Sequence, residues 1–218
     1  ILTLNRKTHK AYNRIRENNF SLERLTGFNL YQKTVGVVGT GLIGSAFCRI
    51  LKGFGCHIIA YDLIENPKMK TLGVQYVSMD DLLAQSDIIS LHCPLSPATQ
   101  HLIDAKSFAK MKDGVMLINT SRGALINTKD AISALKRKKI GYLGIDVYEQ
   151  EENLFYKDLS EYIIPDDTIA RLMSFPNVMM TSHQGFFTKE ALSQIASITI
   201  GNLDDIEQNR LCPNVVNV

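Results

Sequence analysis

Arg122, Asp146 and His183 are the residues of this chain whose types and positions point most directly to chemistry. Each lies within three residues of the end of a short run of apolar and β-branched residues, the pattern expected where a buried strand ends. A guanidinium offers a bidentate fork that matches a carboxylate, and an imidazole titrates near neutral pH and can transfer a proton. Arg122 taken alone would more often be a surface residue in a turn. Because three such groups follow successive strands, we predict a ligand site where the carboxyl ends of the strands meet.

A glycine pattern, G-x-G-x-x-G, is formed by Gly39, Gly41 and Gly44 directly after the apolar run Thr34–Val38 and at the start of a helical segment. In this context the first glycine permits a tight turn, the second lets the backbone approach a pyrophosphate, and the third lets the helix pack on the strand. Glycines also mark ordinary turns, so the pattern alone is a weak signal. Its position between a strand and a helix favours a phosphate-binding turn.

Leu42, Ile43 and Asp62 complete the predicted dinucleotide site. Leu42 and Ile43 would present backbone N–H groups at a helix N-terminus, whose positive dipole end favours the phosphates. Asp62 ends the next strand, eighteen residues after Gly44, where a carboxylate can accept hydrogen bonds from both hydroxyls of an adenosine ribose. A 2′-phosphate would meet this negative charge with no Arg or Lys in residues 63–65 to offset it, so NAD is favoured over NADP. The alternative for Asp62 is a solvated acid at a strand end.

The elements that must position these residues alternate between short β-branched runs and helical segments, which indicates βαβ units and a doubly wound parallel sheet of the α/β class. Several runs are apolar throughout, as expected where helices cover both faces of the sheet. The predicted strands are Thr34–Val38, His57–Tyr61, Val74–Val77, Asp87–Leu91, Val115–Asn119, Leu143–Ile145 and Val178–Met180. The predicted helices are Leu42–Phe54, Met79–Gln85, Asp104–Met111, Thr128–Arg137 and a long one from about Lys189 to Gln208, with Thr188 as its N-cap.

Three further segments are less regular. Residues from about Thr3 to Asn18 have the spacing of a charged, partly exposed helix, and Ser21 to Gln32 is interpreted as a connector. Gln150 to Pro165 is acidic and aromatic and has no clear period, and loops of this length in a compact domain are often functional.

The composition narrows the class of protein. Hydrophobic residues make up 45% of the 218 and charged residues 21%, which excludes collagen, coiled coils and disordered chains. The net charge of +2 is too small to favour nucleic acid or an anionic membrane as a partner. The four cysteines include no C-x-x-C pair, so no metal site or disulfide framework is predicted. Without a long apolar stretch or a signal peptide, the protein is expected to be soluble and cytoplasmic.

Five ordered motifs resemble the D-isomer-specific 2-hydroxyacid dehydrogenases, and the resemblance runs through nearly all of the chain. The motifs are Gly39–Gly44, Leu91–Thr99, Ile118–Ile126, Gly144–Glu149 and Ser182–Gln184. Further segments are similar to the bacterial D-lactate dehydrogenases of this family, namely Leu4–Tyr12, Phe20–Glu23, Gly53–Gly55 and Leu211–Asn214. The resemblance implies a Rossmann NAD-binding domain and NAD as the cofactor.

The resemblance also implies residue roles. It assigns substrate-carboxylate binding to Arg122, the general acid and base to His183, and the acid that partners this histidine to Glu151. Glu149 and Glu152 are interpreted as solvated loop acids. The implied cofactor contacts are Leu42, Ile43, Asp62, Cys93, Pro94, Thr99, Thr120, Ser121, Arg122 and Asp146. The remaining histidines are expected to be structural or exposed, namely His9, His57, His92 and His101.

The chemistry implied is reduction of a small 2-oxo acid such as pyruvate to a D-2-hydroxy acid such as D-lactate. Arg122 would anchor the carboxylate and help polarise the ketone, and His183, kept protonated by Glu151, would protonate the ketone oxygen as hydride arrives. Two alternatives stay open. The chain could be an NAD-responsive binding module, like corepressor relatives of the family, or the substrate could be another D-2-hydroxy acid.

The chain also departs from the family pattern, because the N-terminal segment of the substrate domain has no counterpart here. We therefore expect residues 1–187 to form the NAD-binding domain, including the N-terminal helix and connector. Residues 188–218 would be a C-terminal helix and tail that return toward an absent substrate domain. We expect such a fragment to bind NAD without turnover and to pair as a homodimer through the NAD-binding domain. The helix's apolar face would be exposed, repacked or covered by another chain, and comprises Leu192, Ile195, Ile198 and Leu203.

Overall fold

The computed structural model describes residues 1–215, and of Asn153 only the backbone. Its first compact unit spans Ile1–Ser182, and its second begins at His183. The predicted domain division after residue 187 stays a prediction, because compactness alone does not show which residues belong to a substrate domain.

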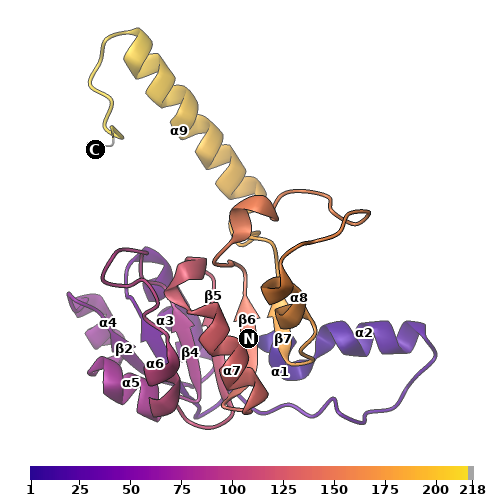
Figure 1. Cartoon of the computed structure of the whole chain (residues 1–218). Coiled ribbons are helices and arrows are strands. Elements are labelled where there is room, and N and C mark those ends of the chain that lie inside the picture. The colour runs from indigo at the N-terminus through magenta and orange to yellow at the C-terminus, as the bar shows by residue number, and fades with distance from the viewer. Residues whose placement is uncertain (216–218) are drawn as a thin grey trace. The chain divides into compact units, whose positions relative to one another are not determined.

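The first unit contains a seven-stranded sheet in the order β3-β2-β1-β4-β5-β6-β7 (Figure 1). Every pair of neighbouring strands is parallel, which confirms the predicted doubly wound α/β fold. The chain reverses its direction of travel across the sheet between β1 and β4, and this switch point is where such sheets bind ligands. The strands are β1 (Thr34–Val38), β2 (His57–Tyr61), β3 (Gln75–Tyr76), β4 (Ile88–Leu91), β5 (Val115–Asn119), β6 (Ile140–Ile145) and β7 (Val178–Met180).

Two apolar layers form because successive side chains of a strand point to opposite faces of the sheet. In β5, Val115 and Leu117 lie in one buried cluster, whereas Met116 and Ile118 lie in the other. The first cluster is completed by α5 (Met79–Gln85), α6 (Ala105–Lys110), α7 (Thr128–Lys136) and α8 (Asp167–Met173). The second is completed by α1 (Leu2–Arg6), α3 (Leu42–Gly53) and α4 (Pro67–Leu72).

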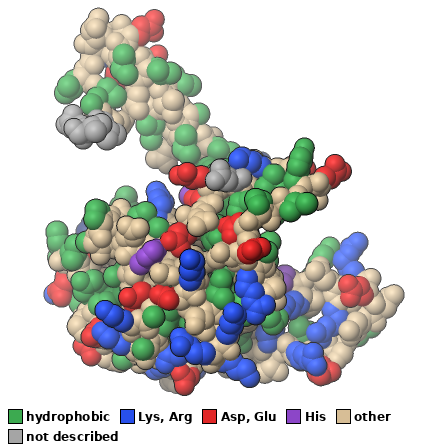
Figure 2. Space-filling model, viewed as in Figure 1, with side chains coloured by type: hydrophobic (Ala, Val, Ile, Leu, Met, Phe, Trp, Pro, Cys, Tyr) green, Lys and Arg blue, Asp and Glu red, His purple; other side chains and the backbone are tan. Residues whose placement is uncertain are grey.

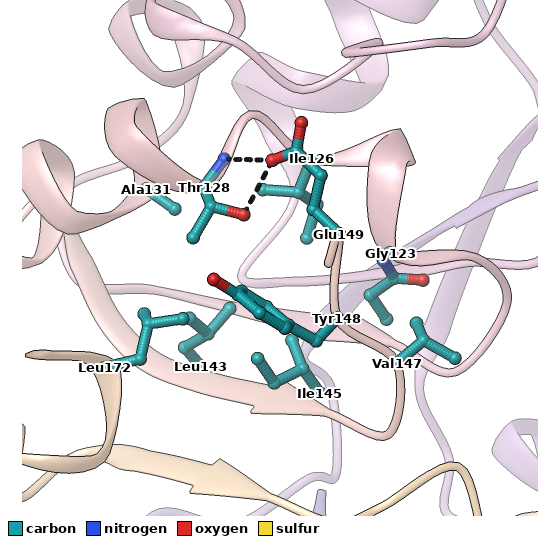
Figure 3. Close-up of a pocket in the computed structure, with 11 residues that line it drawn as sticks. Gly123, Ile126, Thr128, Ala131, Leu143, Ile145, Val147, Tyr148, Glu149 and Leu172 are labelled. Atoms are coloured by element: carbon teal, nitrogen blue, oxygen red, sulfur yellow. Dashed lines mark hydrogen bonds between the residues drawn. The ribbon is translucent and has the colours of Figure 1, made fainter. Parts of the chain in front are cut away.

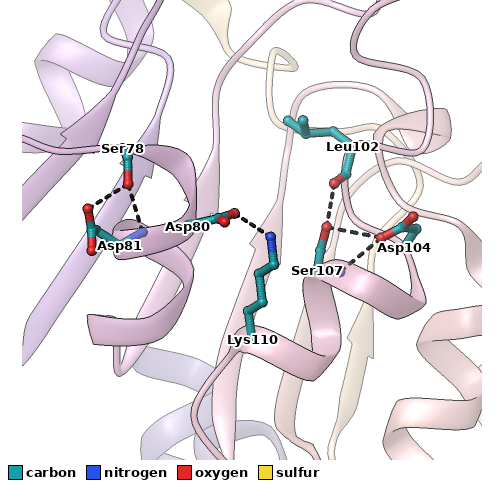
Figure 4. A network of polar contacts seen from close by, with 7 residues as sticks. All are labelled: Ser78, Asp80, Asp81, Leu102, Asp104, Ser107 and Lys110. Atoms are coloured by element: carbon teal, nitrogen blue, oxygen red, sulfur yellow. Dashed lines mark hydrogen bonds and ion pairs between the residues drawn. The ribbon is translucent and has the colours of Figure 1, made fainter.

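Side-chain caps fix where several helices begin. Ser78 accepts a hydrogen bond from the backbone N–H of Asp81 at the start of α5, and Asp104 accepts one from Ser107 at the start of α6. An ion pair between Asp80 and Lys110 links these two helices (Figure 4). The caps satisfy N–H groups that have no partner inside the helix. They therefore fix the residue at which each preceding loop ends and the helix begins.

The N-terminal segment differs from the prediction of one helix over Thr3 to Asn18. It forms α1 (Leu2–Arg6) and α2 (Thr8–Arg16), which are separated by Lys7 in the left-handed conformation at φ 50°. In α1, Leu4 is buried against the sheet and the buried amide of Asn5 bonds both backbone groups of Phe28. No residue of α2 is buried. The break at Lys7 therefore separates a helix with residues buried in the domain from a helix with none.

Two helices were not predicted, and both carry start signals. α4 (Pro67–Leu72) is capped by Asn66, has proline in its first turn, and is followed by Gly73 in the left-handed conformation. α8 (Asp167–Met173) is capped by Asp166, whose carboxylate accepts hydrogen bonds from two backbone N–H groups. Short 3-10 turns were also missed, at Gly123–Leu125 and at Glu151–Asn153 inside the irregular acidic segment.

The second unit contains α9 (Lys189–Glu207), and the predicted cap is confirmed because Thr188 accepts a hydrogen bond from Ala191 N–H. No residue of α9 is buried. Its apolar side chains are visible along the helix in Figure 2, and they include Leu192, Ile195, Ile198 and Leu203, each at least 41% exposed. Within the described part of the chain, no helix has the length and apolar character needed to span a membrane.

Candidate functional site

The glycine-rich turn joins β1 to α3, and its three glycines meet different surroundings. At Gly39, which has φ 91°, a Cβ would lie 2.8 Å from the backbone nitrogen of Cys93. At Gly44 it would lie 2.0 Å from the carbonyl oxygen of Gly39, whereas at Gly41 it would meet nothing within 4 Å. The first and third glycines are therefore required by packing, and the second leaves open space in front of a helix N-terminus. That space fits a pyrophosphate group.

Leu42 and Ile43 start α3 beside this space, and both side chains are largely exposed. Gly41 caps the helix with no side-chain hydrogen bond. The capping residue therefore leaves the first backbone N–H groups of α3 without a side-chain acceptor. An anion-binding helix N-terminus needs N–H groups in this state.

Asp62 follows β2 and is brought directly onto the glycine-rich turn. Its Oδ2 accepts hydrogen bonds from the backbone N–H of Thr40 at 2.6 Å and from the Thr40 hydroxyl at 2.8 Å. Burial alone would raise the pKa of Asp62, but the hydrogen bonds from Thr40, together with the backbone N–H groups of Leu63 and Ile64, outweigh it and lower the pKa. The carboxylate therefore stays ionised near neutral pH, as a ribose acceptor must.

Thr40 was not singled out from the sequence, although it is the residue that ties the turn together. It is 2% exposed, and its hydroxyl also accepts a hydrogen bond from Tyr76 Oη at 2.8 Å. Its carbonyl oxygen accepts from Ser45 Oγ at 2.7 Å. Thr40 lies between two glycines of the pattern, but only the fold brings Tyr76 to it from an edge strand.

The loop after β4 reaches the same edge of the sheet. The hydroxyl of Ser121, from the loop after β5, donates to the carbonyl oxygen of Cys93 at 2.7 Å. Burial, assisted by the nearby charge of Asp62, raises the pKa of the Cys93 thiol, so this side chain stays neutral. Further along the loop, the Thr99 hydroxyl donates to Pro94 O at 2.7 Å, which holds these two predicted cofactor residues in one turn.

Asn119 joins the loops after β5 and β6. This asparagine is 1% exposed, and its amide donates to Arg122 O at 2.8 Å while accepting from Ser121 N–H at 3.1 Å. Its own carbonyl oxygen accepts from the backbone N–H of Asp146 at 3.0 Å. The turn that carries Thr120, Ser121 and Arg122 is thereby held next to Asp146. As the last residue of an apolar strand, Asn119 could have been recognised from the sequence.

Arg122 and Asp146 differ in exposure. Arg122 is exposed, and one Nη donates to Ser121 O at 2.7 Å. Asp146 is buried and accepts a hydrogen bond from the Thr181 hydroxyl. A buried carboxylate held in this way is a fixed acceptor, whereas the exposed guanidinium can turn to a ligand.

The loop after β6 contains one correction. Glu149 is not a solvated loop acid, because its side chain is only 26% exposed and contacts His101 Nε2 at 2.6 Å. Its other oxygen accepts hydrogen bonds from Thr128 N–H and Oγ1 at 3.3 and 2.9 Å (Figure 3). The adjoining cavity has a volume of about 20 Å³, room for about one water, so it is no cofactor site. Glu149 and His101 instead hold two loops together.

Glu151, the predicted partner of the catalytic histidine, begins a 3-10 turn in the same loop. Its Oε2 accepts a hydrogen bond from Tyr148 N–H at 2.8 Å, and the Tyr148 hydroxyl donates to Asp166 at 2.7 Å. The loop is therefore anchored on both sides of Glu151.

His183 is the first residue of the second unit. Its backbone has φ 53°, in the left-handed region, and its ring packs edge-on against Phe186 at a centroid distance of 6.3 Å. Its convergence with Arg122 and Glu151 stays a prediction.

A phosphate-binding glycine turn at the switch point of a parallel sheet, with an ionised carboxylate after the next strand, defines a dinucleotide-binding domain of the Rossmann type. Residues 1–185 match the family model described as the NAD-binding domain of the D-isomer specific 2-hydroxyacid dehydrogenases. The chain therefore belongs to this family, and NAD is the cofactor of the domain.

Named relatives are consistent with this assignment. The chain is 55% identical over 216 residues to a 2-hydroxyacid dehydrogenase homolog of Haemophilus influenzae, covering 99% of this chain and 65% of the relative. It is 52% identical over 214 residues to the D-lactate dehydrogenase of Escherichia coli, covering 98% and 65%. A solved structure of the pyruvate reductase of Chlamydomonas reinhardtii superimposes with a TM-score of 0.94 at 47% identity, covering 97% and 64%. The chain thus spans just under two thirds of the length of each.

Proposed function

We propose that this chain is the cofactor-binding part of an NAD-dependent dehydrogenase that interconverts pyruvate and D-lactate. The observation that carries the proposal is the meeting of five strand-end segments at one edge of the sheet. Hydrogen bonds or close backbone packing link Asp62 to the glycine turn, the turn to Cys93, Cys93 to Ser121, and the Ser121 turn to Asp146. The names of the Escherichia coli and Chlamydomonas reinhardtii relatives support the choice of substrate pair.

The proposed cofactor contacts divide between the two ends of the dinucleotide. The backbone around Gly41 and the N-terminus of α3 would hold the pyrophosphate, and Asp62 would accept hydrogen bonds from the adenosine ribose. The nicotinamide end would lie toward the segments after β4, β5 and β6. These contribute Cys93, Pro94, Thr99, Thr120, Ser121, Arg122 and Asp146.

The proposed catalytic residues act on the oxo acid. NADH, when bound, supplies the hydride. Arg122 binds the substrate carboxylate through its guanidinium fork. A guanidinium has five N–H donors, and the Ser121 carbonyl oxygen accepts from only one of its nitrogens, so donors remain for the carboxylate. His183 donates a proton to the ketone oxygen, and Glu151 holds the imidazole in its protonated form. In the reverse direction His183 accepts the proton from the hydroxyl of D-lactate.

The test combines turnover and binding. We expect the complete gene product to oxidise NADH with pyruvate, and this chain to bind NADH in a fluorescence titration. The same assay includes 2-oxoisocaproate and phenylpyruvate. Preference for one of these acids would assign a different D-2-hydroxy acid, and NADH binding without turnover of any of them would favour the NAD-responsive binding module.

We also propose that the chain forms a homodimer through its NAD-binding domain. α2 lies away from the sheet (Figure 1) and has no buried residue. Tyr12 and Ile15 on α2, and Phe20 and Leu22 after it, are all more than half exposed. Apolar side chains gathered on one segment are typical of a surface covered by another chain. Sedimentation velocity should give twice the monomer mass, and a monomer at micromolar concentration would contradict this.

A cytoplasmic location is the last part of the proposal. Cys48, Cys56, Cys93 and Cys212 are all thiols in the structure, which suits a reducing compartment. Cell fractionation tests the location.

A further inference from the structure

A chain of hydrogen bonds ends on the carboxylate of Asp62. The backbone N–H of Asn66 donates to Tyr76 Oη at 2.9 Å, the Tyr76 hydroxyl donates to Thr40 Oγ1 at 2.8 Å, and the Thr40 hydroxyl donates to Asp62 Oδ2 at 2.8 Å. The direction is forced at both ends, because a backbone N–H can only donate and an ionised carboxylate can only accept. Each hydroxyl therefore has a fixed orientation.

The two oxygens of Asp62 are consequently unequal. Oδ2 accepts from both the N–H and the hydroxyl of Thr40, which uses the two acceptor positions of a carboxylate oxygen. Oδ1 has a long contact, 3.5 Å from the backbone nitrogen of Ile64, and the backbone N–H of Leu63 also lies close to the carboxylate. The remaining acceptor capacity of this carboxylate lies at Oδ1.

We propose that Thr40 and Tyr76 are positioning residues for cofactor selection. They hold Oδ2 of Asp62 against the glycine-rich turn, so that Oδ1 receives the hydroxyls of the adenosine ribose. This inference rests on the proposed binding of the ribose by Asp62. It adds two residues that do not touch the cofactor, one of them on the edge strand β3, and it assigns recognition to one oxygen of the carboxylate.

Selectivity between NADH and NADPH is the property that such positioning controls. A ribose hydroxyl donates to a carboxylate, whereas a 2′-phosphate meets it as a like charge. If Thr40 acts by orienting Asp62, its loss weakens NADH binding more than NADPH binding. A distorted glycine turn would weaken both cofactors together, because both carry the same pyrophosphate.

The experiment measures the dissociation constants of NADH and NADPH by fluorescence titration of this chain. Thr40→Val keeps the shape of the side chain and the backbone N–H but removes the hydroxyl, and Thr40→Ser restores it. Tyr76→Phe removes only the middle hydroxyl of the chain. Thr71→Val, on the neighbouring helix α4, is the matched control, since the Thr71 side chain is exposed and bonds only Pro67 O. Thermal unfolding of each variant accompanies the titrations.

We expect Thr40→Val to raise the NADH dissociation constant about tenfold and Tyr76→Phe about threefold, the range for hydrogen bonds that serve a charged group. Thr40→Ser should bind NADH like the wild type, and the ratio of the NADPH to the NADH dissociation constant should fall in Thr40→Val. Parallel weakening of both cofactors, or no change for NADH, would overturn the inference.

Asp62→Ala separates this inference from the proposed function. In that background Thr40→Val should have no further effect on NADH binding, because the threonine acts through the carboxylate. An additional loss in the double variant would overturn the positioning role while leaving Asp62 as the ribose ligand. An unchanged NADH dissociation constant in Asp62→Ala itself would instead remove the ribose contact from the proposed function, and with it the basis of this inference.

Discussion

The glycine-rich turn and the segments that carry Glu151 and His183 are built in different ways. Around the turn, Thr40 and Asp62 bond each other directly within one βαβ unit. The predicted acid and base are divided, because Glu151 lies in the first compact unit and His183 begins the second. All the proposed cofactor contacts therefore lie in the first compact unit, whereas the proposed proton transfer uses one residue from each unit. Binding and turnover should accordingly be separable by mutation.

The largest effect is expected at His183. In the complete gene product, His183→Gln should reduce turnover of pyruvate by about 10²–10⁴-fold, the range for a positioned general acid, and leave the NADH dissociation constant unchanged. His57→Gln is the control, because His57 is exposed at the start of β2. Stopped-flow measurement of NADH oxidation gives the rate, and fluorescence titration gives the binding. Turnover at the wild-type rate would remove His183 from the mechanism.

Two glycines of the turn allow binding to be separated from folding on the cofactor side. Gly41→Ala should leave the melting temperature unchanged, since the added Cβ meets nothing within 4 Å, but weaken NADH binding at least about tenfold by occupying the space for the pyrophosphate. Gly44→Ala should destabilise the fold, because its Cβ would lie 2.0 Å from Gly39 O. Thermal unfolding and NADH titration of both variants test the contrast. Equal melting temperatures for the two variants would contradict it.

Arg122 lies between the two regions in the sequence, and its substitution should affect the substrate more than the cofactor. Arg122→Lys in the complete gene product replaces a bidentate fork by a point charge, so we expect the KM for pyruvate to rise about tenfold, roughly the loss of one charge-assisted hydrogen bond. The NADH dissociation constant should change less than the KM for pyruvate. Arg137→Lys, at the exposed end of α7, is the matched control. A larger effect on NADH than on pyruvate would place Arg122 at the cofactor instead.

The fold could be predicted from the sequence where one physical signal dominates. Buried parallel strands are apolar on both faces, and β1, β2, β5 and β7 have the predicted bounds. The break at Lys7 could not be predicted, because a lysine in the left-handed conformation has no compositional signal. α4 could have been, since Asn66 and Pro67 are a start signal and Gly73 a stop signal.

The site shows the same division. The glycines and Asp62 have local patterns, and the structure brings them together as the motif requires. Thr40 lies within that pattern, but its role depends on Tyr76, which is 36 positions away. Glu149 and His101 are 48 positions apart, and no periodicity links them. Interactions between loops of different βαβ units depend on the packing of the whole sheet. The spacing of residues along the sequence carries no information about that packing.

The smallest effect concerns this loop contact and distinguishes stability from chemistry. Burial alone would raise the pKa of Glu149, but hydrogen bonds from His101 and Thr128 outweigh it and lower the pKa. A carboxyl group whose pKa is lower in the folded than in the unfolded protein stabilises the fold above its unfolded pKa, and this contribution is lost as the pH falls through the folded value. Glu149→Gln should therefore lower the free energy of unfolding by roughly 1 kcal/mol at pH 7, and the difference from the wild type should shrink below about pH 4.

Urea unfolding of this chain at pH 7 and at lower pH measures the difference, with Glu152→Gln as the control because Glu152 is exposed in the same loop. NADH binding should be equal in all three proteins, since neither glutamate belongs to the proposed cofactor contacts. If the difference in free energy of unfolding between Glu149→Gln and the wild type did not depend on pH, the charge of Glu149 would not be what joins the two loops. Its hydrogen bonds alone would then do so. The contact would then stabilise the loop that carries Glu151 at every pH, and the loop would contribute no acid sensitivity of its own to the fold.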